Sequence, residues 1–236
     1  MSLPTNMDNQ RDGGGRGDGE DREDREDRED RGDKDNILSK ILNPMNAVTI
    51  NFKPILELTD DQFYRLCRAN PDVKFERNAQ GELIIMPPTG GETGNRNVEI
   101  ATEFVIWNRQ TKLGKVFDSS TCFKLPNGAD RSPDVSWIQQ ERWDTLTPEE
   151  KEKFPPLAPD FVLELMSPSD SLKVTQDKMK EYMENQVRLG WLIDPKTRRV
   201  EIYRQGQDVE ISKSPTLLSG EDVLPGFILN LQFVWN

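Results

Sequence analysis

The sequence predicts an α/β domain in which a mixed central β-sheet is flanked by helices. Helical and strand patterns follow one another in the order helix, hairpin, helix, strands, helix, strands, which favours a mixed sheet over a doubly wound one. Two short apolar runs, residues 161–166 and 191–193, are typical of central strands covered on both faces. A charged, glycine-rich segment precedes this domain and lacks its hydrophobic periodicity.

Residues 1–47 are interpreted as a disordered, mixed-charge, low-complexity tail. Within them, residues 20–31 repeat Glu-Asp-Arg, and a period of three cannot keep one face of a helix buried. The repeat does not indicate which partner the tail would bind. Residues 48–236 remain, enough for one well-packed domain.

The first half of this domain contains two predicted helices and a hairpin. Thr59 and Gln62 fit a capping box, which predicts a helix that ends near Ala69. A turn between residues 73–77 and 82–86 predicts the hairpin. A longer helix is expected over residues 93–111, with its buried face formed by Val98, Ala101, Val105 and Ile106.

The second half contains most of the predicted strands and one more helix. A helix that begins at Asp170 or Ser171 and ends near Gln186 would bury Leu172, Met179 and Met183. The expected strands are residues 115–118, 121–125, 134–138, 161–166, 191–193, 200–204 and 227–235.

Composition excludes several kinds of chemistry. The chain of 236 residues contains no histidine, so Ser-His-Asp catalysis, His-ligated zinc and an imidazole base are excluded. Its two cysteines match no zinc or redox motif. The net charge of −11 disfavours extended, non-specific coating of nucleic acid. Any chemistry must therefore use carboxylates, amines, hydroxyls or a bound ion.

Targeting signals are not evident in the sequence. The amino terminus is charged and rich in glycine, unlike a signal peptide, and no run approaches the length of a membrane helix. We therefore expect a cytoplasmic protein that does not bind a membrane.

Two carboxylates stand in unusual places. Glu164 lies inside an apolar strand, where an unpaired charge would cost several kcal/mol, and Asp134 begins another strand. If the strands are neighbours, the two side chains converge and can bind Mg²⁺, which prefers oxygen ligands. The alternative is that Glu164 forms a structural salt bridge with an arginine and Asp134 merely starts its strand.

Several ordered blocks of sequence resemble one bacterial protein family. The resemblance covers about residues 54–236, and its blocks are PPTGGETG (87–94), RSPDVS (131–136), PDFVLELMSPSD (159–170), Lys178 and WLIDP (191–195). They are similar to the Uma-two family of restriction endonucleases, within the PD-(D/E)xK nuclease superfamily.

The resemblance implies a restriction-endonuclease-like fold and a set of catalytic residues. Asp134 and Glu164 would bind Mg²⁺, with Mn²⁺ as a substitute, and Lys178 would assist. Glu99 is the candidate for a further acid from the first long helix. The chain departs from the superfamily pattern at Met166, where a lysine is usual, so Lys178 would be supplied from the following helix instead.

The expected function is Mg²⁺-dependent hydrolysis of DNA phosphodiester bonds by an endonuclease. Cleavage of both strands would favour a homodimer. One alternative is a catalytically inactive nuclease-fold protein that acts as a nucleic-acid-binding or regulatory module. Another is a structural or interaction protein whose function lies in the charged tail, while the acids form salt bridges.

Overall fold

The computed structural model describes residues 47–53 and 55–236 of the chain. Nearly all of the segment interpreted as a tail, residues 1–47, lies outside these described residues. Within the described ranges, none of the helices is both long enough and apolar enough to cross a membrane.

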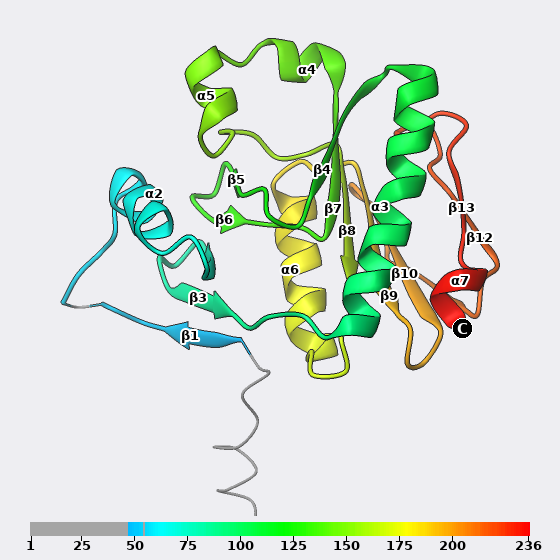
Figure 1. Cartoon of the computed structure of the whole chain (residues 1–236), viewed down its shortest axis with the longest axis horizontal. Helices are drawn as coiled ribbons and strands as arrows, with labels where there is room; N and C mark the ends of the chain where they lie inside the picture. Colours follow the sequence, from blue (N-terminus) through cyan, green and yellow to red (C-terminus); the bar gives the residue numbers. More distant parts are fainter. Residues whose placement is uncertain (1–46, 54) are drawn as a thin grey trace, which may run out of the picture. The chain divides into compact units, whose positions relative to one another are not determined.

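The central element is a mixed six-stranded sheet in the order β11-β10-β9-β8-β7-β4. Only β8 and β9 pair in parallel, and the other neighbours are antiparallel. The predicted mixed α/β fold is therefore confirmed (Figure 1). Its strands are β4 (Gly114–Asp118), β7 (Val135–Gln139), β8 (Phe161–Leu165), β9 (Leu189–Asp194), β10 (Arg199–Arg204) and β11 (Glu210–Lys213).

Two smaller sheets accompany the central one. A five-stranded sheet has the order β1-β3-β2-β6-β5, and β12 pairs with β13. The strands of these sheets are β1 (Val48–Ile50), β2 (Lys74–Arg77), β3 (Leu83–Met86), β5 (Phe123–Lys124), β6 (Asp130–Arg131), β12 (Leu217–Ser219) and β13 (Ile228–Asn230). The chain leaves the five-stranded sheet at β6 and enters the central sheet at β7 after three residues, the last of which is Asp134.

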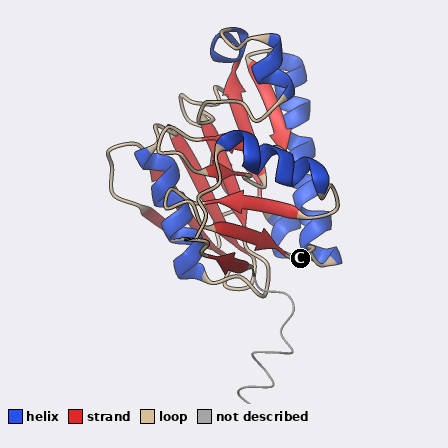
Figure 2. Ribbon diagram, turned by 90° about the vertical axis from the view of Figure 1, so that its left-hand side faces the viewer, coloured by secondary structure: helices blue, strands red, loops and turns tan. Residues whose placement is uncertain are grey.

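The described helices are α2 (Asp60–Ala69), α3 (Gly91–Thr111), α4 (Gln140–Asp144), α5 (Pro148–Glu152), α6 (Leu172–Glu184) and α7 (Gln232–Trp235). The capping box predicted at the start of α2 is present, because Thr59 and Gln62 exchange hydrogen bonds. Figure 1 shows β7 and β8 running between α3 and α6, and Figure 2 shows helices on both sides of the strands.

The two faces of the central sheet have separate hydrophobic cores. Side chains alternate along β8, so Phe161 and Leu163 join the core that contains α3, whereas Val162 joins the core that contains α6. The helix α6 connects the parallel strands β8 and β9, which places it on one face of the sheet. Glu164, two residues after Val162, faces α6.

The buried face of α3 differs from the predicted one. Phe104 and Trp107 are buried, whereas Val98 is 66% exposed and Ile106 is 45% exposed. Aromatic side chains bury more apolar area than valine or isoleucine, so they determine which face of the helix meets the sheet. Of the predicted face, Ala101 packs against the core, whereas the placement of Val98 and Ile106 on the buried side was wrong.

The carboxyl-terminal segment is also shorter as a strand than predicted. It forms β13 and then the short helix α7, in place of one strand over residues 227–235. The Oδ1 atom of Asn230 accepts the backbone N–H of Gln232 at 2.9 Å, which turns the chain at this point.

We expect Gly114→Ala to lower the free energy of unfolding by about 3 kcal/mol. A β-carbon at Gly114 would lie 2.1 Å from the carbonyl oxygen of Ile138 and 2.5 Å from the ring of Trp137. These neighbours belong to β7, so β4 would have to move away from it. Urea unfolding measures the loss, and Gly94→Ala is the control because nothing lies within 4 Å of its β-carbon position. Equal stability of the two variants would show that β4 adjusts freely.

Candidate active site

The two predicted carboxylates lie on neighbouring strands of the central sheet. Val135 of β7 pairs with Leu163 of β8 in antiparallel register. One step further along this register sets Asp134 directly opposite Glu164. Both side chains face α6, because residues on one face of a strand recur every second position. The structure therefore brings Asp134 and Glu164 together.

Asp134 is fixed at the start of β7 by the neighbouring strand. Its Oδ2 atom accepts the backbone N–H of Leu165 at 2.9 Å, which takes the place of a further ladder bond. Burial raises the pKa of Asp134 above its usual value, and the charge of Lys74 opposes this shift. Among the described residues, no hydrogen bond uses its Oδ1 atom, so this oxygen remains available to a ligand.

Glu164 is buried but not isolated. Its side chain interacts through Oε1, which accepts the Tyr182 hydroxyl at 2.9 Å and lies 2.9 Å from Nζ of Lys178. Burial raises the pKa of Glu164 to about 7, and the nearby charge of Asp134 adds to this rise while Lys178 opposes it. Its Oε2 atom has no hydrogen bond within the described part of the chain.

Lys178 reaches Glu164 from α6, with its Nζ atom 2.9 Å from Oε1 of that carboxylate. Its side chain is only 12% exposed, whereas that of Lys180 on the same helix is 58% exposed. Burial acts to lower the pKa of the Lys178 ammonium, but the negative charges of Glu164 and Glu76 outweigh it and raise the pKa above its usual value. The amine is therefore a permanent positive charge and not a proton acceptor.

Met166 directly follows β8, at the position where the superfamily that the sequence resembles usually has a lysine. It is 8% exposed and packs in the α6-side core with Met179 and Tyr182. A charged amine there would lie among these apolar groups. The position of Lys178 on α6 supplies the amine from the opposite direction.

Glu99 is not brought to this cluster. It is exposed on α3, and that helix packs on the other face of the central sheet. Ile100 and Phe104 are the residues that α3 turns toward the sheet, and Glu99 precedes Ile100 by about 100° of helical rotation. Within the described residues, the Glu99 side chain forms no hydrogen bond or ion pair.

Two residues near the cluster were not predicted from the sequence. Tyr182 is fully buried against Glu164, although its helical spacing from Lys178 was visible. Glu76, on β2, is 1% exposed and accepts a hydrogen bond from Lys178. The sequence around Glu76 is polar and does not indicate that its side chain is buried.

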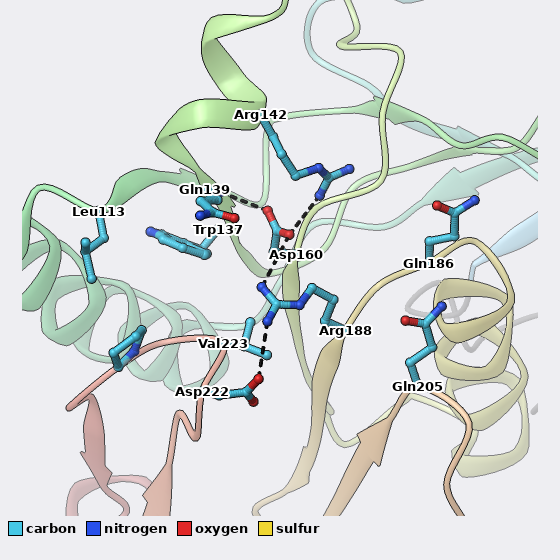
Figure 3. A pocket seen from close by; sticks show the side chains of 11 residues that line it. Leu113, Trp137, Gln139, Arg142, Asp160, Gln186, Arg188, Gln205, Asp222 and Val223 are labelled. Atoms are coloured by element: carbon cyan, nitrogen blue, oxygen red, sulfur yellow. Dashed lines mark hydrogen bonds and ion pairs between the residues drawn. The ribbon is translucent and has the colours of Figure 1, made fainter.

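A cavity of about 630 Å³ lies elsewhere. It opens at the other end of β7, beyond Trp137 (Figure 3). There Asp160 accepts the backbone N–H of Gln139 at 2.8 Å and pairs with Arg142 at 3.0 Å, and Arg188 lies 3.9 Å away. Because these groups satisfy the carboxylate, the cluster is a structural charge network.

Comparison with known proteins identifies a family and a similar solved structure. Residues 60–232 match the model of the Uma2 family, described as "Putative restriction endonuclease". Among solved structures, the chain is similar to a protein from Anabaena variabilis ATCC 29413, "a putative nuclease belonging to DUF820", with a TM-score of 0.63 and 21% identity over 75% of this chain and 97% of that chain. This likeness shows a shared fold. None of the curated proteins matches the sequence.

Proposed function

Since the chain belongs to the Uma2 family, as its sequence motifs predicted, we propose that it is a metal-dependent endonuclease that hydrolyses DNA phosphodiester bonds. The observation that carries this proposal is the register of β7 and β8, which places Asp134 opposite Glu164. The amine of Lys178, 2.9 Å from Glu164, adds a positive charge beside them. Two acids and a lysine at one point suit phosphodiester hydrolysis.

The chemistry of the donors fits Mg²⁺ or Mn²⁺. Asp134 and Glu164 each keep one carboxylate oxygen without a hydrogen bond in the described part of the chain, and hard cations prefer such oxygens. Among all the residues that the structure describes, no three or more acidic, histidine or cysteine side chains are grouped so that they could hold an ion. Water and phosphate oxygens would therefore complete the coordination, as is usual for Mg²⁺.

The bound ion, Lys178 and Tyr182 would have different roles in the reaction. When bound, the ion supplies Lewis acidity, which lowers the pKa of a water molecule and neutralises charge on the phosphate. Lys178 is held protonated, so it would donate hydrogen bonds to the attacking water or to a phosphate oxygen as negative charge develops. Tyr182 holds the Oε1 atom of Glu164 and thereby orients the carboxylate.

A salt-bridge role alone explains the site less well. Glu164 contacts Lys178 and Tyr182 and lies opposite a second acid. The salt-bridge alternative predicts an arginine partner instead. A second candidate function is a catalytically inactive nucleic-acid-binding module. The observation that favours it is Met166, which replaces the usual strand lysine.

Cleavage assays decide between these functions. Purified protein is incubated with supercoiled plasmid or single-stranded DNA and Mg²⁺ or Mn²⁺, with and without a chelator. We expect nicked or linear products that require the metal. DNA binding without cleavage under all of these conditions would favour the inactive module.

Metal binding is also expected to stabilise the fold in a pH-dependent manner. Because the pKa of Glu164 is raised from 4.5 to about 7, the folded metal-free protein keeps this proton after the unfolded chain has released it, and stability falls as the pH rises through this window. The loss is about 3 kcal/mol, since one pKa unit corresponds to about 1.4 kcal/mol. Mg²⁺ compensates for the new charge, so at about one hundred times its Kd it should raise Tm by roughly 5 °C at pH 8, and by less at pH 6.

The control for this measurement is Glu164→Gln. The amide does not ionise, so the variant should show a flatter dependence of Tm on pH and a smaller Mg²⁺ shift than the wild type. Differential scanning fluorimetry at both pH values measures the two quantities. An equal Mg²⁺ shift in wild type and variant would place the ion elsewhere.

A further inference from the structure

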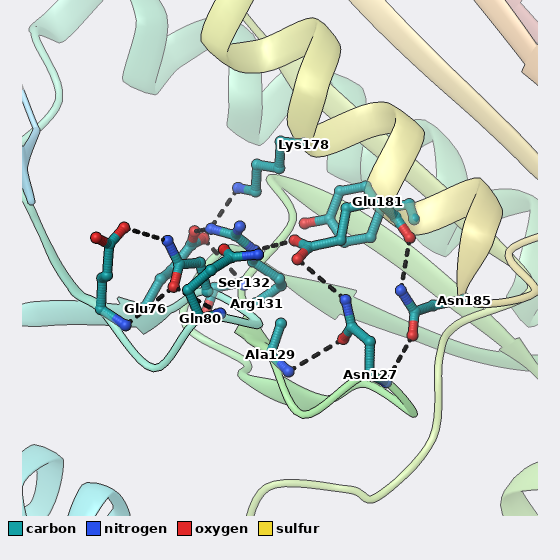
Figure 4. A network of polar contacts seen from close by, with 12 residues as sticks. Glu76, Gln80, Asn127, Ala129, Arg131, Ser132, Lys178, Glu181 and Asn185 are labelled. Atoms are coloured by element: carbon teal, nitrogen blue, oxygen red, sulfur yellow. Dashed lines mark hydrogen bonds and ion pairs between the residues drawn. The ribbon is translucent and has the colours of Figure 1, made fainter. Parts of the chain in front are cut away.

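Glu76 makes an unusual number of contacts for a residue outside the central sheet. It lies on β2 of the five-stranded sheet and is 1% exposed. Its Oε1 atom accepts hydrogen bonds from the backbone N–H of Ser132 at 3.1 Å and from Nζ of Lys178 at 2.9 Å. Its Oε2 atom accepts one from Nη1 of Arg131 at 3.0 Å (Figure 4).

The first consequence concerns Lys178. Its Nζ atom lies 2.9 Å from Oε1 of Glu76 and 2.9 Å from Oε1 of Glu164, so the amine is held between two carboxylates from different sheets. A lysine side chain has four rotatable carbon–carbon links and loses much entropy when it is fixed. A single partner would leave the amine free to move around it, whereas two partners fix its position.

The second consequence concerns Asp134. Arg131, the last residue of β6, and Ser132, the next residue, both donate to Glu76, and they precede Asp134 by three and two residues. Arg131 is anchored on its other side, since its Nε donates to Oε2 of Glu181 at 2.6 Å. Glu181 lies on α6, one turn after Lys178, so the same network ties the helix to this segment.

Charge balance shows why this residue must be an anion. Burial acts to raise the pKa of Glu76, but the charges of Lys178 and Arg131 outweigh it and lower the pKa to about 2. The two cations therefore favour the ionised form of Glu76. It offsets two buried cations, each of which also binds a second glutamate.

We propose that Glu76 is a positioning residue of the nuclease centre, which holds the amine of Lys178 beside Glu164 and fixes the segment that carries Asp134. This inference rests on the proposed nuclease function. It assigns the five-stranded sheet a part in catalysis. Glu76 is too buried to contact DNA itself, so it acts through Lys178.

The main test is Glu76→Gln, which preserves shape and removes the charge. We expect kcat for DNA cleavage to fall by roughly 10- to 100-fold, with KM for DNA nearly unchanged, because misplacement of a catalytic group by about 1 Å has an effect of this size. The matched control is Glu201→Gln. Glu201 is an equally buried glutamate, held by Arg199, Gln176 and Tyr203, and its contacts lie outside the cluster. Its replacement should leave kcat per folded molecule unchanged.

A double-mutant cycle separates positioning from general damage. If Glu76 acts mainly through the lysine, Glu76→Gln should lower kcat much less in a Lys178→Met background than in the wild type, and the small remaining loss would come from the segment before Asp134. Multiplied losses in the double variant would overturn the proposal. Should Glu76→Gln fail to fold, the same cycle is run with Glu76→Asp, which keeps the charge but withdraws the carboxylate from Lys178.

A second readout does not depend on cleavage. Acetic anhydride labels free amines, and mass spectrometry gives the labelling rate of Lys178 relative to Lys173 and Lys180 on the same helix. We expect Lys178 to be labelled several times faster in Glu76→Gln than in the wild type. An unchanged rate would overturn the proposal even if the wild type cleaves DNA. If the wild type does not cleave DNA, the nuclease function fails and this rate alone decides whether Glu76 holds the lysine.

Discussion

Replacement of Asp134 or Glu164 by alanine is expected to lower kcat for DNA cleavage by at least about 1,000-fold, because in the proposed site each would supply one of the two protein oxygens for the ion. The described residues hold no third acid close enough to complete an ion site with these two. Asp134→Asn and Glu164→Gln should lose almost as much, since an amide oxygen is a weaker ligand for Mg²⁺. Single-turnover cleavage of plasmid DNA measures the loss.

The matched control for Asp134 is Asp160. Each is an aspartate just before a strand of the central sheet, and each accepts a backbone N–H from the neighbouring strand, Asp134 from Leu165 and Asp160 from Gln139. Asp160 lies at the far end of these strands. Asp160→Asn should therefore lower stability without lowering kcat per folded molecule. Cleavage that survives Asp134→Ala and Glu164→Ala would indicate a different site or a contaminating nuclease.

Lys178→Met is expected to damage both activity and stability. Activity should fall by roughly 100-fold or more through loss of the fixed positive charge. Glu76 and Glu164 would remain buried without their shared cation, at a cost of about 3–5 kcal/mol. Because protonation of Glu164 relieves part of this cost, the destabilisation should be smaller at pH 6 than at pH 8.

Urea unfolding at the two pH values and cleavage kinetics measure these effects. Lys180→Met is the control, since its amine is exposed on the same helix and its nearest acidic partner is 4.0 Å away. Near-normal cleavage by Lys178→Met would show that the lysine serves only to stabilise the fold. If Lys180→Met lost as much stability as Lys178→Met, the loss would come from replacing a lysine in this helix and not from the buried ion pairs.

Local patterns predicted the elements that bear the site. The almost continuous apolar run of β8 identified a central strand, and an acid within it marked Glu164 as exceptional. Asp134 was a candidate because it is an acid at the start of another predicted strand. Their meeting depends on the register of β7 with β8, which no local pattern contains, and the resemblance to a nuclease family supplied that expectation.

Other parts of the site depend on long-range pairing. Glu76 lies in a strand whose sequence, Lys-Phe-Glu-Arg, looks like an exposed hairpin arm. It becomes buried because β2 pairs with β6, and β6 is encoded more than fifty residues later as only two residues, Asp130 and Arg131. Charged residues in so short a strand give no periodic signal, so neither the pairing nor the burial could be predicted.

The location of the lysine on α6 links catalysis to local unfolding. In a nuclease whose acid and lysine stand two residues apart on one strand, the two groups separate only when the sheet itself opens. Here the proposed ligands stand just before β7 and within β8, whereas the amine arrives on α6, a separate helix whose local unfolding would leave the strand pairing intact. Each opening of α6 would produce a molecule that is mostly native but silent. The protection of α6 amides from hydrogen exchange therefore sets an upper limit on the active fraction, and mutations in the packing of Met179 would tune activity from a distance.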